Sequence, residues 1–278
     1  MGKLVWIRLK VQLSFEVGEQ ILIEEGMSKY RAFLFPESQI EGDWITLDGR
    51  ESHHLIKVFR ARRGETVEVL DGQGRRYLGR LCEANARAAV VQVEKVETVS
   101  AVNCRVTLLQ AMPKGKAMDL ILRMASEIGI AELQPVYTAQ SEVTIPEERI
   151  AGKVEKWRAT TVEACKQCGL AYLPDVLRPQ RLRDWFSEHP RQPSEIRLVA
   201  SLEEGSELLL DKLREARLPE RVVLAVGPEG DFSAEEYAAL RESGFAPVRL
   251  GRNVLRAETA VAYMLSVIDQ RLQARGGD

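Results

Sequence analysis

The stretch Val222-Val223-Leu224-Ala225-Val226-Gly227-Pro228-Glu229-Gly230-Asp231-Phe232-Ser233 decides the fold of this chain. Its first five residues form an uninterrupted apolar run, which is typical of a central strand in a parallel sheet. Its last residue begins a predicted helix over 233–243, because Ser233 and Glu236 have the spacing of a capping box and Gly244 can end the helix. The loop between strand and helix therefore lies where open α/β sheets bind their ligands.

A second loop of the same kind follows about twenty residues later. Leu250-Gly251-Arg252-Asn253-Val254-Leu255-Arg256-Ala257-Glu258-Thr259-Ala260 comes after a predicted strand and leads into a predicted helix. Glycines let a ligand approach the backbone, and the first turn of a helix presents free N–H groups. No G-x-G-x-x-G opens any strand–helix unit, which argues against a nicotinamide dehydrogenase and favours another kind of cofactor site. The competing interpretation is a pair of tight turns, with Glu229 merely exposed and Glu258 complementing the helix dipole.

Strands and helices alternate from residue 104 onward, which predicts a parallel sheet. The predicted strands cover residues 106–111, 133–137, 196–201, 221–226 and 247–250. The predicted helices cover residues 117–128, 147–168, 182–186, 206–216, 233–243 and 258–272. In the first helix we expect Leu120, Met124 and Ile128 to form the apolar face, with Gly129 at its end. In the last helix the expected apolar stripe is Val261, Met264, Leu265, Ile268 and Leu272.

Residues 29–98 have a different, β-rich pattern. Residues 66–70 alternate with period two, and Asp71-Gly72-Gln73-Gly74 is typical of a turn between strands. Short strands at this spacing predict a small barrel. We therefore expect two domains, residues 29–98 and residues 102–278. Residues 1–28 match neither, and the purine-rich codons possible for Glu24-Glu25-Gly26 suggest that Met27 is the true start, with a genuine extension strand as the alternative.

Basic side chains gather in the β-rich part. His53, His54, Lys57, Arg60, Arg62 and Arg63 lie within eleven residues, and Arg75, Arg76 and Arg80 flank the next hairpin. On one face of a small barrel such residues contact phosphates. The candidate RNA-binding residues are Arg31, His53, His54, Lys57, Arg60, Arg62, Lys114 and Lys116. The alternative is a solvated charged surface.

Composition narrows the classes of function. The 278 residues carry a net charge of −2, so RNA binding requires a local basic patch. Four cysteines imply no disulfide framework, and the lone C-x-x-C of Cys165 and Cys168 has no histidine near it in the sequence, which favours buried thiols over a metal site. Apolar runs are too short for a membrane span, and the N-terminus lacks the features of a signal peptide. We expect a cytoplasmic protein without a metal.

Four segments together resemble the SPOUT methyltransferases, and within them the RsmE family, from about residue 30 to residue 273. The family's usual GPEGGFS is here GPEGDFS at 227–233, and its LG-x-R-x-LR-x-ETA is here LGRNVLRAETA at 250–260. Its K-A-x-E-L-G helix is similar to MASEIG at 124–129, and its paired histidines correspond to His53 and His54. The chain departs from the family at Asp231, where glycine is usual, and at Asn253 and Leu170, where arginine is usual.

The resemblance implies a PUA-like β-barrel followed by an α/β domain with a C-terminal trefoil knot, and a homodimer packed through the knotted region. It implies S-adenosylmethionine as cofactor and, as target, N3 of a uridine in the 16S rRNA of the small ribosomal subunit, uridine 1498 in standard numbering. The implied cofactor-binding residues are Ser201, Leu202, Gly227, Pro228, Glu229, Gly230, Leu250, Gly251, Val254, Leu255, Thr259 and Ala260. A non-catalytic RNA-binding or ribosome-assembly protein, or a methyltransferase acting on another RNA site, are the alternatives.

Methyl transfer to N3 requires loss of the imide proton. We expect Arg256 to stabilise the negative charge that then grows on the uracil carbonyl oxygens. Glu229 is the second catalytic candidate, as a contact to cofactor or substrate. The loops contain no histidine, so the general base stays open between water and a carboxylate.

Overall fold

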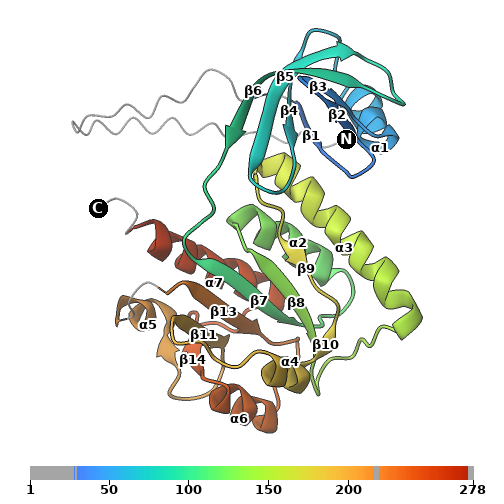
Figure 1. Cartoon of the computed structure of the whole chain (residues 1–278). Coiled ribbons are helices and arrows are strands. Elements are labelled where there is room, and N and C mark those ends of the chain that lie inside the picture. Colours follow the sequence, from blue (N-terminus) through green and yellow to red (C-terminus); the bar gives the residue numbers. More distant parts are fainter. Residues whose placement is uncertain (1–27, 29, 216–218, 275–278) are drawn as a thin grey trace, which may run out of the picture.

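The computed structural model describes residues 28, 30–215 and 219–274; the predicted leader, and with it the choice between Met1 and Met27, lies outside them. Two sheets follow one another along the chain and occupy separate parts of the molecule (Figure 1). The first part, residues 30–98, is named the β unit below, and the second, residues 105–274, the α/β unit. The predicted division into two domains stays a prediction, although β6 ends at Thr98 and the next strand begins at Arg105.

The β unit contains a six-stranded sheet in the order β1-β4-β5-β6-β3-β2. Its strands are β1 (Tyr30–Phe33), β2 (Gln39–Glu41), β3 (Trp44–Thr46), β4 (Thr66–Leu70), β5 (Arg75–Glu83) and β6 (Val90–Thr98). The β-rich pattern missed one feature, because the paired histidines lie on helical turns: α1 (Gly49–His53) and the π-helix η1 (His54–Val58). Asp48 begins α1 by accepting from the backbone N–H groups of Arg50 and Glu51.

The α/β unit contains an all-parallel sheet in the order β10-β8-β7-β13-β11-β14-β12, with β9 also paired to β8. Its strands are β7 (Arg105–Ala111), β8 (Glu132–Tyr137), β9 (Asp175–Val176), β10 (Gln180–Arg181), β11 (Glu195–Ala200), β12 (Glu207–Leu208), β13 (Arg221–Val226) and β14 (Phe245–Arg249). Its helices are α2 (Ala117–Ile128), α3 (Glu147–Cys168), α4 (Leu182–Glu188), α5 (Leu209–Glu215), α6 (Ala234–Glu242) and α7 (Ala257–Gln273). The predicted parallel sheet, preceded by a β-rich unit, is confirmed, and the trefoil knot stays a prediction.

Helices cover both faces of this sheet, because alternate residues of its central strands are apolar in both directions. In β13, Val222 and Leu224 pack in the core shared with α2, α3, α5 and α7, whereas Val223 and Ala225 pack against α4 and α6. Among the described residues, no helix is both long and apolar enough to cross a lipid bilayer.

The apolar face predicted for α2 is wrong at Leu120, whereas Ile128 is partly buried and packs against the core. Leu120 is exposed, and the helix buries Met118, Ile121, Leu122 and Ala125 instead. Helices α3 and α7 both pack on α2, and their position, rather than the spacing of its largest apolar residues, selects the buried side. The predicted helix ends and caps are confirmed: Gly129 has φ of +102°, and Ser233 and Glu236 form the capping box of α6.

Side chains of the β unit hold the end of α3. Arg31 donates hydrogen bonds to the carbonyl oxygens of Lys166 (3.1 Å) and Gln167 (2.9 Å), and Arg76 donates to that of Gly169 (2.7 Å). Gly169 has φ of +78°, and a Cβ there would lie 2.9 Å from Nη2 of Arg31. The glycine therefore both ends α3 and lets the arginine approach its carbonyls.

Backbone and apolar contacts complete this junction. Gly74 donates to the carbonyl of Ala171 (3.0 Å), and Leu173 donates to that of Gly72 (2.9 Å). Phe33 and Leu70 of the β unit pack with Val162 of α3 in a small buried cluster. Buried contacts of both kinds fix the β unit on the C-terminal end of α3 (Figure 1).

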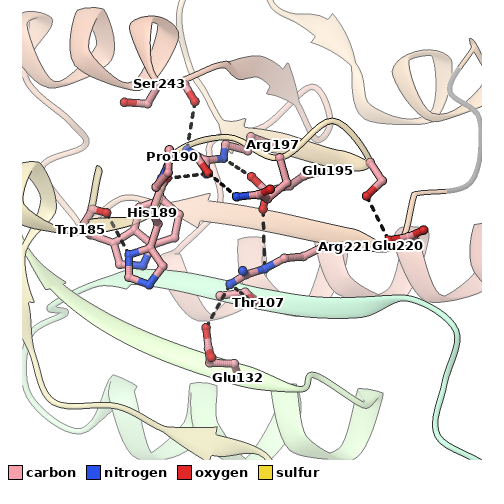
Figure 2. A network of polar contacts seen from close by, with 12 residues as sticks. Thr107, Glu132, Trp185, His189, Pro190, Glu195, Arg197, Glu220, Arg221 and Ser243 are labelled. Atoms are coloured by element: carbon pink, nitrogen blue, oxygen red, sulfur yellow. Dashed lines mark hydrogen bonds and ion pairs between the residues drawn. The ribbon is translucent and has the colours of Figure 1, made fainter. Parts of the chain in front are cut away.

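A polar network lies at the amino ends of the sheet strands (Figure 2). Arg197 forms a buried ion pair with Glu195 and donates to the carbonyls of Ser243 (3.1 Å) and His189 (2.7 Å). Arg221 approaches Glu195 from β13, with 3.7 Å between Nε and Oε2. Because both charges of the pair have partners, their burial is compensated, and the network joins β11, β13 and the segment before β14.

Candidate functional site

Three loops meet at the carboxyl ends of β11, β13 and β14. They enclose a cavity of about 570 Å³, named the loop cavity below. The three strands are parallel neighbours or near neighbours, so their carboxyl ends open at the same edge of the sheet. Both glycine-containing stretches singled out in the sequence therefore contribute to one site.

Most predicted cofactor-binding residues line the loop cavity. Those that do are Ser201, Leu202, Gly227, Pro228, Glu229, Leu250, Gly251, Val254, Leu255 and Ala260, together with the catalytic candidate Arg256. Gly230 and Thr259 are not among the lining residues. The lining residues that were not predicted are Ala200, Glu203, Val226, Asp231, Arg249, Arg252, Asn253 and Ala257. Several of these residues belong to the two loops quoted in the sequence analysis. Including every residue of each loop would have predicted them.

The loop after β11 is held in place by hydrogen bonds and an ion pair. The backbone N–H of Ser201 donates to the carbonyl of Val248 (2.9 Å), and the Ser201 hydroxyl accepts from the N–H of Glu203 (3.0 Å). The Glu203 carboxylate pairs with Arg241 of α6 at 2.7 Å. These contacts fix the loop after β11 against β14 and α6.

The loop after β14 differs from the loop after β11, because several of its backbone N–H groups are free to bind a ligand. Among the described residues, the N–H groups from Gly251 to Leu255 donate to no protein acceptor. A Cβ built on Gly251 meets no atom within 4 Å, so the space beside it is open. Backbone donors without internal partners at the wall of a cavity are suited to hydrogen bonds with a bound molecule.

Glu229 ties two loops together. Its carboxylate accepts from the backbone N–H of Lys114, at 3.0 Å to Oε1 and 3.3 Å to Oε2. Lys114 follows β7, and its ammonium pairs with Glu142 at 2.5 Å, which raises the pKa of the lysine. The Glu229 side chain therefore positions the loop after β13 next to the start of α2, and its carboxylate already has a protein partner.

Asp231 occupies a backbone conformation that favours glycine. Its φ is +63°, and its side chain compensates for the strain. Oδ1 accepts from the N–H of Phe232 (2.8 Å) and from the hydroxyl of Tyr237 (2.9 Å). Burial raises the pKa of Tyr237, so the phenol stays protonated and donates to the carboxylate. The departure from the family pattern at residue 231 thus has a physical explanation.

Arg256 is exposed at the wall of the loop cavity and immediately precedes α7. No protein acceptor for its guanidinium is found among the described residues. An unpaired guanidinium beside a cavity can donate to the oxygen of a bound molecule. The position of Arg256 is compatible with the role expected from the sequence.

The predicted RNA-binding residues fall into two groups. His53, Lys57, Arg60, Arg62, Lys114 and Lys116 are exposed. Arg31 and His54 instead contact other protein groups. Arg31 binds Glu68 and the end of α3, and His54 lies 3.2 Å from Nζ of Lys166. Arg76 and Arg80 likewise contact protein partners.

Lys166 is a buried ammonium between three groups that could otherwise bind a metal. Oxygen atoms of Glu51 and Glu163 each lie 2.8 Å from its Nζ, and Nδ1 of His54 lies 3.2 Å away. The candidate ligand atoms of these three residues lie within 4.8 Å of one another, but the lysine already supplies the positive charge there. This cluster connects α1 and η1 to α3.

The two cysteines of the C-x-x-C pair lie in different environments. Cys165 is buried, and burial raises its pKa to about 12, so it stays a neutral thiol near pH 7. The prediction of a buried thiol is wrong for Cys168, which is exposed at the end of α3. The last turn of the helix turns this side chain outward, while Cys165 faces the core.

Comparison with known proteins identifies both units. The family described as "RNA methyltransferase domain" matches residues 100–269, and the one described as "RNA methyltransferase PUA domain" matches residues 47–94. The ribosomal RNA small subunit methyltransferase E of Synechocystis sp. is 32% identical over 245 residues, which are 88% of this chain and 78% of that protein. The Aquifex aeolicus protein of the same name is 33% identical, over 77% of this chain and 90% of its own length.

A solved structure agrees with these relatives. The ribosomal RNA small subunit methyltransferase E from Neisseria gonorrhoeae, bound to S-adenosyl methionine, superimposes with a TM-score of 0.76. It is 27% identical, and the match covers 87% of this chain and 97% of that one. The matched sequence families, the relatives and the shared fold lead to one conclusion: the chain belongs to the RsmE family of RNA methyltransferases.

Proposed function

We propose that this protein transfers a methyl group from S-adenosylmethionine to N3 of a uridine in 16S rRNA of the small ribosomal subunit. The observation that carries the proposal is the loop cavity, which brings the two family loops together and has Arg256 at its wall. Family membership supports the reaction class. The target position, uridine 1498 in standard numbering, rests on the family alone.

The loop cavity fits the proposed cofactor in size and in lining. Pockets for small molecules commonly enclose roughly 300–1,000 Å³, and this one encloses about 570 Å³. Leu202, Val254 and Leu255 offer apolar walls for a flat ring, and the free N–H groups of residues 251–255 offer hydrogen bonds. When bound, the cofactor supplies an activated methyl group.

The protein contributes orientation and charge. Arg256 donates to a uracil carbonyl oxygen and stabilises the negative charge that grows there as the N3 proton passes to water or to a carboxylate. Glu229 acts by positioning, because its carboxylate holds the N–H of Lys114 and so fixes the loop after β13 beside the start of α2. The cavity holds the base close to the methyl group, which lowers the entropic part of the barrier.

The RNA reaches this cavity over the exposed basic residues. His53, Lys57, Arg60 and Arg62 of the β unit, and Lys114 and Lys116 beside the cavity, are positioned for phosphate contacts. The proposed substrate implies a cytoplasmic enzyme.

We propose in addition that two copies form a homodimer through the proposed knot and α7. Val254 and Leu202 of the loop cavity are 76% and 61% exposed, and Tyr263 of α7 is 46% exposed, which is unusual for large apolar side chains. A second copy packed there would cover them. Light scattering after size-exclusion chromatography is expected to give twice the mass of the 278-residue chain.

The test of the function uses small ribosomal subunits that lack this modification, and free 16S rRNA, with labelled S-adenosylmethionine. Digestion and mass spectrometry of the nucleosides are expected to yield 3-methyluridine. A different methylated nucleoside would move the assignment to another RNA site. Absence of transfer together with absence of cofactor binding would favour a non-catalytic RNA-binding protein of the same fold.

A further inference from the structure

A second hollow lies at the junction of the two units, away from the loop cavity. It encloses about 530 Å³ and is named the junction groove. Its lining residues are Arg50, Arg123, Glu127, Lys156, Ala159, Thr160, Glu163, Ala164 and Gln167. They come from α1 of the β unit and from α2 and α3 of the α/β unit.

The charge of the junction groove is positive. Arg50, Arg123 and Lys156 are exposed, and no carboxylate within ion-pair distance of them is found among the described residues. Lys166 lies 2.8 Å from both Glu163 and the buried Glu51, so it balances only one of them. The four cations Arg50, Arg123, Lys156 and Lys166 therefore exceed the carboxylates Glu51, Glu127 and Glu163 by one charge. The groove therefore favours an anion.

Arg50 is held in a way that leaves its donors available. The guanidinium of Arg50 lies over the ring of Phe35, with 5.6 Å between Cζ and the ring centroid. Stacking uses the face of the guanidinium and leaves its N–H groups free at the edge. Lys156, Thr160, Glu163 and Gln167 recur at helical spacing, so one face of α3 forms a wall of the groove.

The groove is continuous with the exposed basic residues of the β unit and with those beside the loop cavity, Lys114 and Lys116. On α2, Lys116, Leu120, Arg123 and Glu127 are exposed at helical spacing and form one stripe along the helix. The stripe begins next to Lys114, whose N–H is bound by Glu229 of the loop cavity. At a rise of about 1.5 Å per residue, it brings Arg123 about 10 Å closer to the β unit than Lys116.

The same stripe continues on the β unit. Arg50, His53 and Lys57 follow one another at spacings of three and four residues through α1 and η1, and all three are exposed. Exposed basic side chains, interrupted by Leu120 and Glu127, thus follow one another from the loop cavity along α2, through the junction groove, to η1. Cations spaced along helices suit a chain of phosphates. The aromatic rings beside them, Phe35 near Arg50 and Phe59 near His54, are already in contact with protein side chains.

We propose that the junction groove binds the sugar–phosphate backbone of the substrate RNA, with Arg50, Arg123 and Lys156 as phosphate contacts that connect the β unit to the methyl-transfer site. The inference rests on the proposed function. The groove is ready-made for this, because Arg31 and the buried Lys166 cluster already fix α1 and η1 on the end of α3. No ordering of the two units is then needed when RNA binds.

The test is the triple variant Arg50→Gln, Arg123→Gln, Lys156→Gln. A matched control is Arg105→Gln, Arg183→Gln, Arg191→Gln, which removes the same charge at exposed sites outside the groove and the loop cavity. Affinity for 16S rRNA is measured as a function of salt concentration, together with binding of S-adenosylmethionine to the protein alone. Equal thermal unfolding of the two variants establishes that both are folded.

If the groove contacts three phosphates, the slope of log affinity against log salt falls by about 2, since each phosphate on a single strand contributes about 0.7. Cofactor affinity stays at the wild-type value, and the control keeps the wild-type slope. Equal slopes for groove variant and control would overturn the proposal while the wild type still methylates 16S rRNA. Failure of the wild type itself to bind or methylate 16S rRNA would instead overturn the proposed function, and with it the inference.

Discussion

Replacing Asp231 should separate backbone strain from hydrogen bonding in the loop after β13. The residue has φ of +63° and accepts two hydrogen bonds through Oδ1, from Phe232 and Tyr237. Asp231→Ala keeps the strained conformation and removes both bonds. Asp231→Gly removes both bonds as well, but a glycine adopts this conformation without strain.

The magnitudes follow from these contacts. Hydrogen bonds to a charged group contribute about 1.5–3 kcal/mol each, and the half-buried position of Asp231 favours the lower end. We expect Asp231→Ala to lower the free energy of unfolding by about 3 kcal/mol. Asp231→Gly should lose about 1 kcal/mol less, because the left-handed conformation costs a residue with a Cβ roughly 1–2 kcal/mol, partly offset by the greater freedom of unfolded glycine.

Urea unfolding followed by circular dichroism measures this order, with wild type the most stable, then the glycine variant, then the alanine variant. Tyr237→Phe is the matched control, since it removes one donor and leaves the backbone unchanged, at a cost of about 1.5 kcal/mol. An alanine variant as stable as the glycine variant would refute the reasoning, because alanine exceeds glycine in stability wherever the backbone is unstrained. Cofactor affinity, measured by calorimetry, should follow the same order, as Asp231 lines the loop cavity.

Three further predictions follow from other sites. Arg256→Ala should lower kcat about 10²–10³-fold and leave cofactor affinity by calorimetry nearly unchanged, so turnover close to wild type would remove the residue from the reaction. Lys166→Met should destabilise the fold by about 3–5 kcal/mol in urea unfolding, because it leaves Glu51 buried and unpaired; restoring part of the loss with an added Glu51→Gln is the check. Cys165, with a pKa raised by burial to about 12, favours the folded state fully below pH 9, and this contribution falls as the pH rises toward 12. At pH 10 the wild type should lose about 1.4 kcal/mol relative to pH 7 that Cys165→Ala does not lose, and parallel pH profiles of the two proteins would contradict this.

Much of the loop cavity follows from the chain's own pattern. The apolar run that ends at Val226 predicts β13 with the bounds that the structure has, and the capping box at Ser233 predicts the start of α6. Because the strands are parallel, the loops after β11, β13 and β14 must open at one edge of the sheet, and they do. Local signals combined with one topological rule were sufficient here.

Contacts between distant segments are what the sequence does not reveal. Arg31 and His54 look like surface cations in the sequence, yet Arg31 donates to a carbonyl 135 residues away and His54 meets Lys166 at the end of α3. The exposure of Leu120 likewise depends on where α3 and α7 lie on α2. The type of a residue does not reveal whether its side chain is buried or exposed, so only the packing of the whole chain decides its role.

The parallel strands carry different tasks at their two ends. The amino ends of β11 and β13 hold the buried Glu195, Arg197 and Arg221 network (Figure 2), while their carboxyl ends lead into the loop cavity. The polar network that anchors the sheet and the loop cavity thus lie one strand length apart. If methyl transfer takes place in the loop cavity, as we propose, substitutions that change stability can accumulate at the amino ends of the strands with little effect on the reaction, and the two properties can evolve along independent routes.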